Sequence, residues 1–366
     1  MSTEDRHAER VLSGQAWDEF CDALKAAGQV VRDPLIPADP LHHAEGYRYL
    51  TRLLRAGLQT FLENGDPTAP TLERNCHETI KMGADNPDNL YLSAPVTARC
   101  AYRLTGTRGT VHYLGFGLQE GSYGATGSLQ TVAYLDDRSL VVDPDGRITV
   151  TISVDPQPGN WLPMTPDTRT LVVRQSFLDR TTETPAQLTL ERADGPALPA
   201  PLDARRLDRG LQGVTRFVHG CARLFLEWSR GFSQHPNELP PFSAGAATTA
   251  GGVPDITYYH GYWKLAPDEA LVIEATPPDC DYWNFQLNNI WMESLDYRWF
   301  PITLNNATAT PEADGSYRLI VAHEDPGHPN WISTCGHDLG TMCWRWVRAD
   351  VHPQPVTRVV KLSELR

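Results

Sequence analysis

Residues 145–174 read DGRITVTISVDPQPGNWLPMTPDTRTLVVR, and the same outline returns at residues 314–345 as DGSYRLIVAHEDPGHPNWISTCGHDLGTMCWR. In both, an Asp-Gly turn opens a run of alternating apolar residues, a bend rich in Pro and Gly follows, and an Asn-Trp pair precedes a second run that closes on Arg. YLGFGL at residues 113–118 likewise precedes YWNFQL at residues 282–287 by 169 residues. The repeat indicates two copies of one β-module.

The pieces that both copies share are of the kind that hold a fold together. Asp-Gly is a turn pair, in which Gly adopts a positive φ and Asp bonds nearby backbone. We expect Asn160-Trp161 and Asn330-Trp331 to close the two modules, with each indole N–H bonded to a carbonyl group.

The segments around the repeats predict the remaining architecture. From about residue 90 the apolar period is two, as in antiparallel sheets with frequent turns. Before it, Leu50, Leu54 and Leu58 share one face of a helix, and a long amphipathic helix capped by Asp203 joins the copies. We expect a mainly β protein with helices (α+β), with an N-terminal helical segment (1–85), a first jelly-roll-like β-sandwich module (86–200), a connecting helix and flexible loop (201–253) and a second such module (254–366).

Composition narrows the class of protein. The 366 residues can form two cores, and a net charge of −13 without any Lys/Arg-rich run argues against nucleic acid or an anionic membrane as a partner. No signal-like stretch opens the chain, and no apolar run reaches the length of about 18 residues that a membrane span needs. The seven cysteines are scattered and never form CxxC, which indicates a reducing compartment. We expect a cytoplasmic protein, which an exposed edge strand could pair into a homodimer.

Common catalytic motifs are absent from the sequence. It contains no GxSxG elbow, no GxxxxGK[ST] loop and no GxGxxG after a strand, so it favours neither an α/β-hydrolase nor a nucleotide-binding fold. His77-Glu78 and His323-Glu324 each begin like a zincin helix but lack the later His, and no His-x-His pair of the cupin type occurs. We therefore predict no cofactor.

The densest group of ionisable residues lies in AHEDPGHPNWISTCGHD, residues 322–338. A His beside a carboxylate can transfer protons near neutral pH, so His323, Asp325 and His337 are candidate catalytic residues. His323, His328 and His337 could instead bind a metal, and a plain polar loop explains the same residues. The equivalent stretch of the first copy, residues 154–168, contains no histidine, so the fold does not demand histidines at this bend.

A second polar segment, KMGADNPDNLY, covers residues 81–91. Turn-forming Asn and Asp explain it, since both bond their own backbone. The functional alternative places Asp85 or Asp88 at the mouth of a pocket as a base, with Lys81 or Arg103 holding an anionic group of the substrate.

Aromatic residues concentrate at the start of the second copy. Residues 258–300 contain eleven of the 33 aromatic residues of the chain, far above an even share. The period of two sends Tyr282, Asn284 and Gln286 to one face and Trp283 to the other. Such a surface suits either a sandwich core or the wall of a pocket for a large, mostly apolar ligand. The candidate substrate-binding residues are Tyr262, Tyr282, Trp283, Asn284, Gln286, Trp291 and Arg103.

The second copy also resembles a known family. Asp314-Gly315, Asn330-Trp331 and Arg345 follow the pattern of the bacterial family called domain of unknown function 1214, which is often found beside family 1254. The resemblance covers the C-terminal module only and implies a β-sandwich of jelly-roll type. It implies no activity, and the segment at residues 81–96 departs from the longer relatives.

These observations lead to one expectation and its alternatives. We expect a cofactor-independent enzyme of hydrolase, lyase or isomerase type that acts by acid/base chemistry on a hydrophobic or aromatic small molecule. In it, His323 and Asp325 move protons while Tyr282 and Gln286 orient the substrate. The alternative is a non-catalytic binding protein for a lipid, steroid or glycan, and carbohydrate processing would need paired carboxylates. The small residues 243–252, SAGAATTAGG, form either a lid or a mobile linker.

Overall fold

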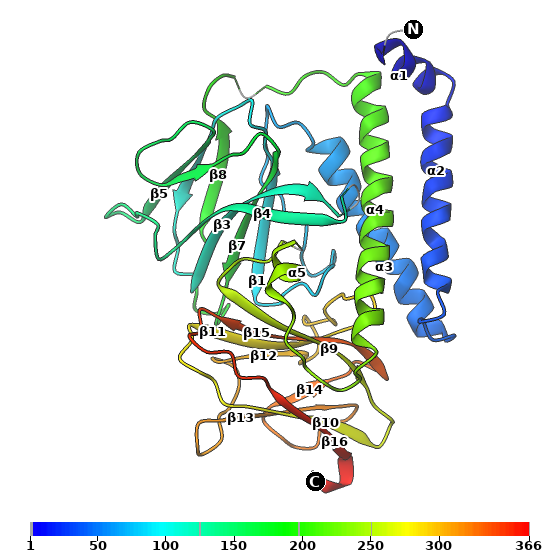
Figure 1. The fold of residues 1–366 in the computed structure, drawn as a ribbon, viewed down its shortest axis with the longest axis vertical. Coiled ribbons are helices and arrows are strands. Elements are labelled where there is room, and N and C mark those ends of the chain that lie inside the picture. The colour runs from blue at the N-terminus through cyan, green and yellow to red at the C-terminus, as the bar shows by residue number, and fades with distance from the viewer. Residues whose placement is uncertain (1–2, 124–125, 197, 250, 366) are drawn as a thin grey trace.

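The long helices lie along one side of the molecule in the computed structural model, which describes residues 3–123, 126–196, 198–249 and 251–365 (Figure 1). Asp39 caps the third helix by accepting the N–H groups of Leu41 and His42, and Pro40 occupies the first helical position. Asp203 caps the long helix through the N–H of Arg206. The helices are α1 (Thr3–Leu12), α2 (Gln15–Ala27), α3 (Pro40–Leu58), α4 (Ala204–Phe232) and α5 (Ala244–Thr249), with a 3₁₀ turn at Gly28–Arg32 and a π turn at Gln59–Glu63.

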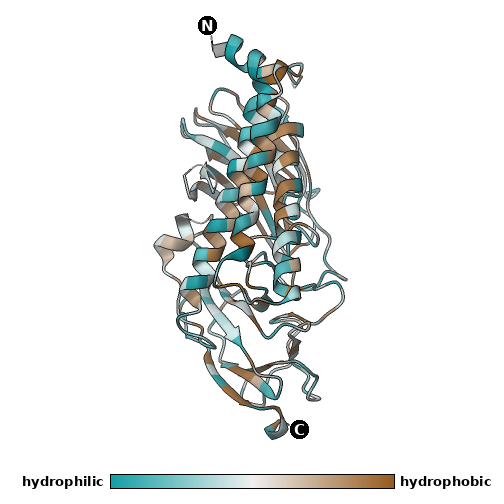
Figure 2. Ribbon diagram, turned by 90° about the vertical axis from the view of Figure 1, so that its right-hand side faces the viewer, coloured by the Kyte–Doolittle hydropathy of each residue, from teal (hydrophilic) through white to brown (hydrophobic). Residues whose placement is uncertain are grey.

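The helices are amphipathic, and their apolar faces form one core. Hydrophilic and hydrophobic residues alternate around them (Figure 2). Val214, Val218 and Phe225 of α4 pack in this core with Tyr49 and Leu53 of α3. Burial of such a stripe stabilises a helix more than intrinsic propensity does. Among the described residues, no helix combines the length and apolarity that crossing a membrane requires.

The first module is a pair of four-stranded sheets. One has the order β1-β7-β3-β4 and the other β6-β5-β2-β8. Tyr102, Leu104, Phe116, Val150 and Leu171 are fully buried between them. The strands are β1 (Asn89–Pro95), β2 (Tyr102–Thr107), β3 (Tyr113–Ser122), β4 (Ser128–Asp136), β5 (Arg147–Ser153), β6 (Trp161–Pro163), β7 (Thr168–Ser176) and β8 (Gln187–Arg192).

The second module repeats the first strand for strand. Its sheets have the orders β9-β15-β11-β12 and β14-β13-β10-β16, in which each strand stands where its counterpart stands in the first module. The predicted α+β fold with two repeated β-modules is therefore confirmed, whereas the jelly-roll connection and the exact domain limits stay predictions. The strands are β9 (Ile256–Lys264), β10 (Glu269–Ala275), β11 (Tyr282–Asn288), β12 (Thr303–Asn305), β13 (Tyr317–Ala322), β14 (Trp331–Ser333), β15 (Leu339–Val347) and β16 (Val356–Lys361), followed by a 3₁₀ turn at Leu362–Glu364.

The Asn-Trp pairs hold equivalent positions in both modules. The amide of Asn160 donates to the carbonyls of Val141 and Thr149 and accepts the N–H of Val141. Asn330 makes the same three bonds, donating to Thr310 and Arg318 and accepting from Thr310. Each Asn therefore ties a connecting loop to the strand beside it, which explains why both copies keep it.

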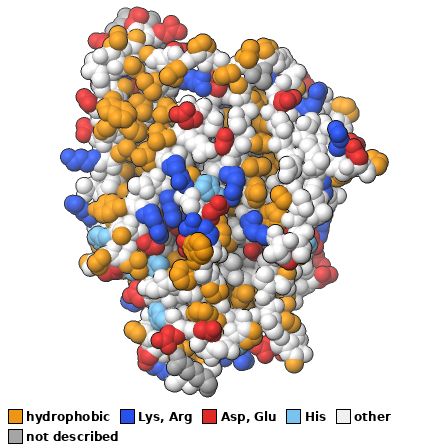
Figure 3. All heavy atoms as spheres, turned by 180° about the vertical axis from the view of Figure 1, so that it is seen from behind, with side chains coloured by type: hydrophobic (Ala, Val, Ile, Leu, Met, Phe, Trp, Pro, Cys, Tyr) orange, Lys and Arg blue, Asp and Glu red, His pale blue; other side chains and the backbone are white. Residues whose placement is uncertain are grey.

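A buried arginine joins the two modules. Arg348, directly after β15, donates to Asp136 at 2.6 Å, to Asp137 at 2.7 Å and to Asp281 at 3.1 Å. The side chain is only 4% exposed, so these carboxylates compensate a charge that is removed from water. Seen from behind, Lys and Arg side chains gather near the middle of the molecule among Asp and Glu, and hydrophobic side chains are exposed over the helical side (Figure 3).

Candidate functional site

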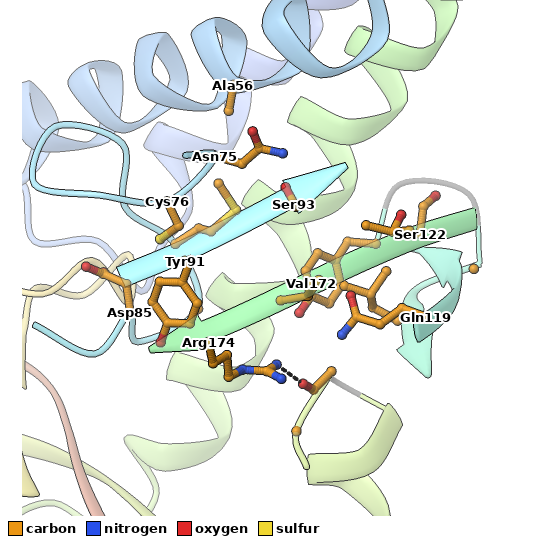
Figure 4. A pocket seen from close by; sticks show the side chains of 18 of the residues that line it. Ala56, Asn75, Cys76, Asp85, Tyr91, Ser93, Gln119, Ser122, Val172 and Arg174 are labelled. Atoms are coloured by element: carbon orange, nitrogen blue, oxygen red, sulfur yellow. Dashed lines mark hydrogen bonds between the residues drawn. The ribbon is translucent and has the colours of Figure 1, made fainter. Parts of the chain in front are cut away.

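A cavity of about 950 Å³ lies between the modules and the helices. Thr170, Val172, Arg174 and Ser176 of β7 line it, while Leu171 and Val173, which point the other way, are buried in the core of the first module. The strand alternation thus gives one sheet a core face and a cavity face. Figure 4 shows labelled lining side chains on β1 and β7 and beside them. Other parts of its surface come from α3, the π turn, α4, α5, β3, β4, β9, β11 and β15.

More of the cavity surface is apolar than polar, although polar side chains such as Glu73, Asn75 and Gln119 also line it. Four of the aromatic rings belong to α4 and the segment after it, where Phe225 packs against Trp228 and Trp228 against Phe242, with ring centroids 5.7 and 5.2 Å apart. The larger apolar residues of the lining are Phe61, Met82, Leu92, Leu129, Val172, Phe217, Phe225, Trp228, Phe242, Ile256 and Val347.

Two arginines from equivalent positions of the repeat reach this cavity. Arg174 in β7 pairs with Tyr91 of β1, and Arg345 in β15 pairs with Tyr258 of β9. All four residues line the cavity. Because the sheets β1-β7-β3-β4 and β9-β15-β11-β12 correspond strand for strand, the duplication delivers two copies of one Tyr-Arg pair to a single space.

The guanidinium of Arg345 is held by neutral groups. It donates to the side-chain oxygens of Asn284 (3.2 Å) and Gln286 (2.6 Å) and to the carbonyl of Ala84 (2.5 Å). The residue is 5% exposed. Arg174 donates to the carbonyl of Gly251, as the dashed line in Figure 4 marks. Among the described residues, no carboxylate oxygen lies within 4.0 Å of either guanidinium group, so neither arginine forms an ion pair there.

Arg174 and Arg345 both lower the pKa values of the same two tyrosines, Tyr91 and Tyr258. Burial raises the pKa of Tyr91 to about 12 although Arg345 and Arg174 lower it. Burial likewise raises the pKa of Tyr258, and again Arg174 and Arg345 both oppose the rise. Both cations therefore act electrostatically on the same pair of hydroxyls of the cavity.

Two deeply buried polar side chains of the cavity have atoms without a hydrogen-bond partner among the described residues. These atoms are Oε1 of Gln119 and Nδ1 of His260, whose side chains are 2% and 6% exposed. The His260 ring is stacked between Phe232 and Tyr258, with centroids 5.3 and 5.9 Å away. Burial, assisted by Arg345, lowers the pKa of His260 to about 3, so its imidazole is neutral at physiological pH. Such groups can bond a polar substituent of a bound molecule.

The structure gathers four of the predicted site residues around Arg345. Asn284 and Gln286 hold its guanidinium directly. Tyr282 lines the cavity, and its hydroxyl donates to Asp88 at 2.6 Å and accepts from Asn86 at 3.1 Å. The carbonyl of Asp85 accepts from Gln286 at 2.8 Å. The polar face expected for the strand at residues 282–287 thus turns toward the cavity side.

The carboxylate of Asp85 serves the contact between modules. It accepts the backbone N–H and the hydroxyl of Ser294, at 2.9 and 2.8 Å. In Figure 4 it points away from the other labelled side chains. Burial raises its pKa although Lys81 and the bonds from Ser294 lower it. Lys81 is buried as well and donates to the carbonyls of Ser294 and Leu295.

Four other predicted binding residues lie elsewhere. Trp283 stacks on Trp344 in the core of the second module, with centroids 4.8 Å apart. Trp291 and Tyr262 belong to the core around the helices, and Arg103 is exposed on β2. None of the four lines the cavity. Their roles as ligand contacts stay predictions without support from this geometry.

The candidate residues of the histidine-rich segment also lie outside the cavity, and they are far from forming one site. They are His323, Asp325, His328 and His337. His323 contacts the hydroxyl of Thr334 at 3.0 Å, and exposed Asp325 accepts the N–H of Gly327. His328 accepts the N–H of Asn330, whereas buried His337 pairs with a carboxylate of α3. The proposed catalytic pair therefore does not reach the cavity. In the part of the chain that the structure describes, no three His, Cys, Asp or Glu side chains are grouped to hold a metal ion.

The segment at residues 243–252 covers one end of the cavity. Ala247, Gly251 and Gly252 line it, and Gly251 receives the bond from Arg174. Gly251 adopts a φ of +79°, and a Cβ there would come within 2.9 Å of the Gln119 amide nitrogen. These three residues line the cavity, and a lid role for the segment stays a prediction.

Sequence reasoning did not select Tyr91, Gln119, Arg174 or His260. Arg174 carried a signal, because each copy of the repeat closes on an arginine. Arginines that both copies keep at equivalent positions, where the neighbouring residues differ, are candidates for one shared role. Nothing in the local sequence distinguished Gln119 or His260 from other polar strand residues.

Comparison with known proteins yields a family and a fold. A family model described as "Protein of unknown function (DUF1214)" matches residues 92–175. An uncharacterised protein from Burkholderia cenocepacia is similar in structure, with 51% identity over 98% of this chain and 99% of that one and a TM-score of 0.96. The VPA0106 protein from Vibrio parahaemolyticus shares the fold at 12% identity, over 87% and 98% of the chains, with a TM-score of 0.50. No curated protein matches.

The matched segment corrects the location of the family resemblance. The sequence pattern assigned it to the C-terminal module, but the family model covers strands β1 to β7 of the first module. The two modules are copies of one strand arrangement, so a pattern of either copy points to the same family. Residues 92–175 match the DUF1214 family of proteins of unknown function, and over nearly its whole length the chain is similar to the uncharacterised Burkholderia cenocepacia protein.

Proposed function

We propose that this protein binds a small, mostly apolar molecule in the cavity between its modules and helices. The observation that carries the proposal is the cavity itself, which has a volume of about 950 Å³ and more apolar than polar surface. Small-molecule sites have volumes of about 300 to 1,000 Å³ and this composition. The partner class is a single organic molecule rather than a polymer.

Binding is favoured over acid/base catalysis by the chemistry of the lining. Efficient proton transfer needs a pKa near the working pH. The pKa of His260 is about 3, and burial raises the pKa values of Tyr91, Tyr258 and Tyr282.

An enzyme without a cofactor, acting on the same class of molecule, is the second candidate. The observation in its favour is Asp85, a buried carboxyl at the cavity whose pKa burial raises. Against it, both carboxylate oxygens already accept bonds from Ser294.

Native mass spectrometry of the purified full-length protein tests the proposal. We expect an added mass that denaturation releases, or a complex with an added apolar compound such as decan-1-ol. Val172→Trp fills the cavity from β7 and should abolish either complex. Val154→Trp at a half-exposed site is the matched control and should retain it. If Val172→Trp and the wild type carry the same ligand, the cavity is not the binding site.

The enzymatic candidate needs a separate measurement. The released or added compound is incubated with the protein and analysed for chemical change. A product that Asp85→Asn abolishes would favour the enzyme, and recovery of the unchanged compound favours the binding protein.

We also propose a cytoplasmic location, with a monomer or a homodimer as the working form. All seven cysteines are free, which suits a reducing compartment. Cell fractionation and sedimentation velocity test the two statements.

A further inference from the structure

We propose that the ligand of the cavity is an apolar carboxylic acid whose carboxylate is bound jointly by Arg174 and Arg345. This inference rests on the proposed binding function and specifies the chemistry that the cavity recognises.

The first support is the arrangement of the two cations. Arg174 and Arg345 occupy equivalent positions on equivalent strands, beside Tyr91 and Tyr258, and all four residues line one cavity. Arginine binds carboxylates through paired N–H donors that match the geometry of the two oxygens. Two such groups that line one cavity would form an anion site without a metal or a helix terminus.

The second support is the balance of charge. Burying a cation away from water is costly unless an anion compensates it. Arg345 bonds only to amide and carbonyl oxygens. The nearby carboxyls are engaged elsewhere, because Asp85 binds Ser294, and Asp88 accepts from the Tyr282 hydroxyl. A ligand carboxylate would supply the compensating charge.

The third support is the number of available donors. A guanidinium group has five N–H donors. Arg345 uses three of them in its bonds to Asn284, Gln286 and Ala84. Arg174 uses one in its bond to Gly251. Both groups therefore keep donors for an oxyanion while their present bonds hold them in position.

The rest of the cavity suits the apolar body of such an acid. Phe225, Trp228 and Phe242 are in ring contact with one another in sequence order and form an aromatic part of the lining. Gln119 and His260 contribute buried acceptor or donor atoms that can bond one further polar substituent. A polyanion such as a nucleotide would leave charges beyond the reach of two arginines in a mostly apolar space.

Paired probes that differ in charge alone test the inference. Decanoate is compared with decan-1-ol, and 2-naphthylacetate with 2-naphthylacetamide, by isothermal titration calorimetry on the full-length protein at pH 7.5. Both acids are ionised at this pH. We expect each carboxylate to bind at least about tenfold more tightly than its neutral partner, because charged hydrogen bonds are worth more than neutral ones.

Variants then locate the anion site. Arg174→Met should remove the preference for the carboxylate and leave the affinity for the neutral partner within about twofold. Arg345→Lys keeps the charge but loses the fork of donors, so it should weaken carboxylate binding. Arg147→Met is the matched control, because Arg147 is exposed on β5 and lies outside the cavity. Its binding profile should equal that of the wild type.

Each outcome has a distinct meaning. Equal affinity for carboxylates and neutral partners would overturn the anion site and leave the proposed binding function intact. A preference that survives in both Arg174→Met and Arg345→Lys would also overturn it. If neither member of either pair binds the wild type, the anion site and the proposed function for apolar ligands both fail.

Discussion

Replacing Glu45 by Gln should destabilise this protein and remove part of its pH dependence. Glu45 of α3 and His337, which precedes β15, form a buried ion pair with 2.8 Å between Oε2 and Nε2. Nδ1 of His337 donates to the carbonyl of Thr334 at 2.9 Å, so both ring nitrogens face acceptors and the protonated ring fits the site. Arg48 and Asn289 also donate to Glu45. The pair fastens the N-terminal helices to the second module.

The pKa shifts of the two partners define the pH window. Burial disfavours both charges, but Glu45 raises the pKa of His337 through its hydrogen bond and charge, and His337 lowers the pKa of Glu45 in the same way. The histidine contribution to stability is fully present below its unfolded pKa of about 6.5 and is lost as pH rises through the folded value. The Glu45 contribution is present above its unfolded pKa of about 4.3 and is lost as pH falls. The pair therefore stabilises most between these values.

The size of the effect follows from burial. Breaking a buried ion pair by removing one partner costs about 3 to 5 kcal/mol. We expect about 3 kcal/mol for Glu45→Gln, because its amide oxygen can still accept from Asn289. At about 2 °C per kcal/mol for a chain of this size, the Tm measured by calorimetry at pH 6 should fall by about 6 °C.

The comparison across pH completes the test. At pH 8 the loss should be smaller, since part of the stabilisation has already titrated away. Glu78→Gln at the exposed Arg74–Glu78 pair is the control and should change Tm by less than about 2 °C. An unchanged Tm for Glu45→Gln at pH 6 would refute the reasoning about the pair, and an equal loss at both pH values would refute its titration.

Three further predictions concern the core, the repeat and the lid. Trp283→Ala should cost about 3 to 5 kcal/mol of unfolding free energy in urea titrations while ligand affinity is unchanged, and weaker binding at full stability would instead favour a role as ligand contact. Asn330→Ala should lower the free energy of unfolding by about 1 to 3 kcal/mol, and by more than Asn160→Ala does. Asn330 is only 1% exposed, so its partners would be left without a hydrogen bond and without access to water. A larger effect at Asn160 would contradict this. Protease cleavage within residues 243–252 should slow when decanoate is bound, and equal rates would speak against a lid.

Much of the architecture was predictable because it depends on local periodicity. The alternation at residues 282–287 correctly separated Tyr282, Asn284 and Gln286 from Trp283, since strand geometry turns successive side chains to opposite faces. Asp203 was recognisable as a helix cap, because a cap bonds backbone only two or three residues away. The repeat itself predicted the two modules with equivalent strand orders.

The candidate site was less predictable because it combines distant segments. His323, His328 and His337 are close in sequence, yet one bonds Thr334, one bonds the backbone of Asn330 and one pairs with α3. A short polar segment that passes through two strand ends sends its side chains in different directions. Histidines that are close together in the sequence are therefore not close together in the fold.

By itself, the sequence determined the duplicated β-modules, the helices that accompany them and the division of each strand into a core face and an outer face. These properties depend on period, turn residues and caps, which act within a few residues. Only the tertiary structure decided that Arg174 and Arg345 line one cavity, because their proximity depends on how two sheets and α4 pack across gaps of more than a hundred residues. That packing brings two repeated strand ends to the cavity in which we propose that an apolar acid binds.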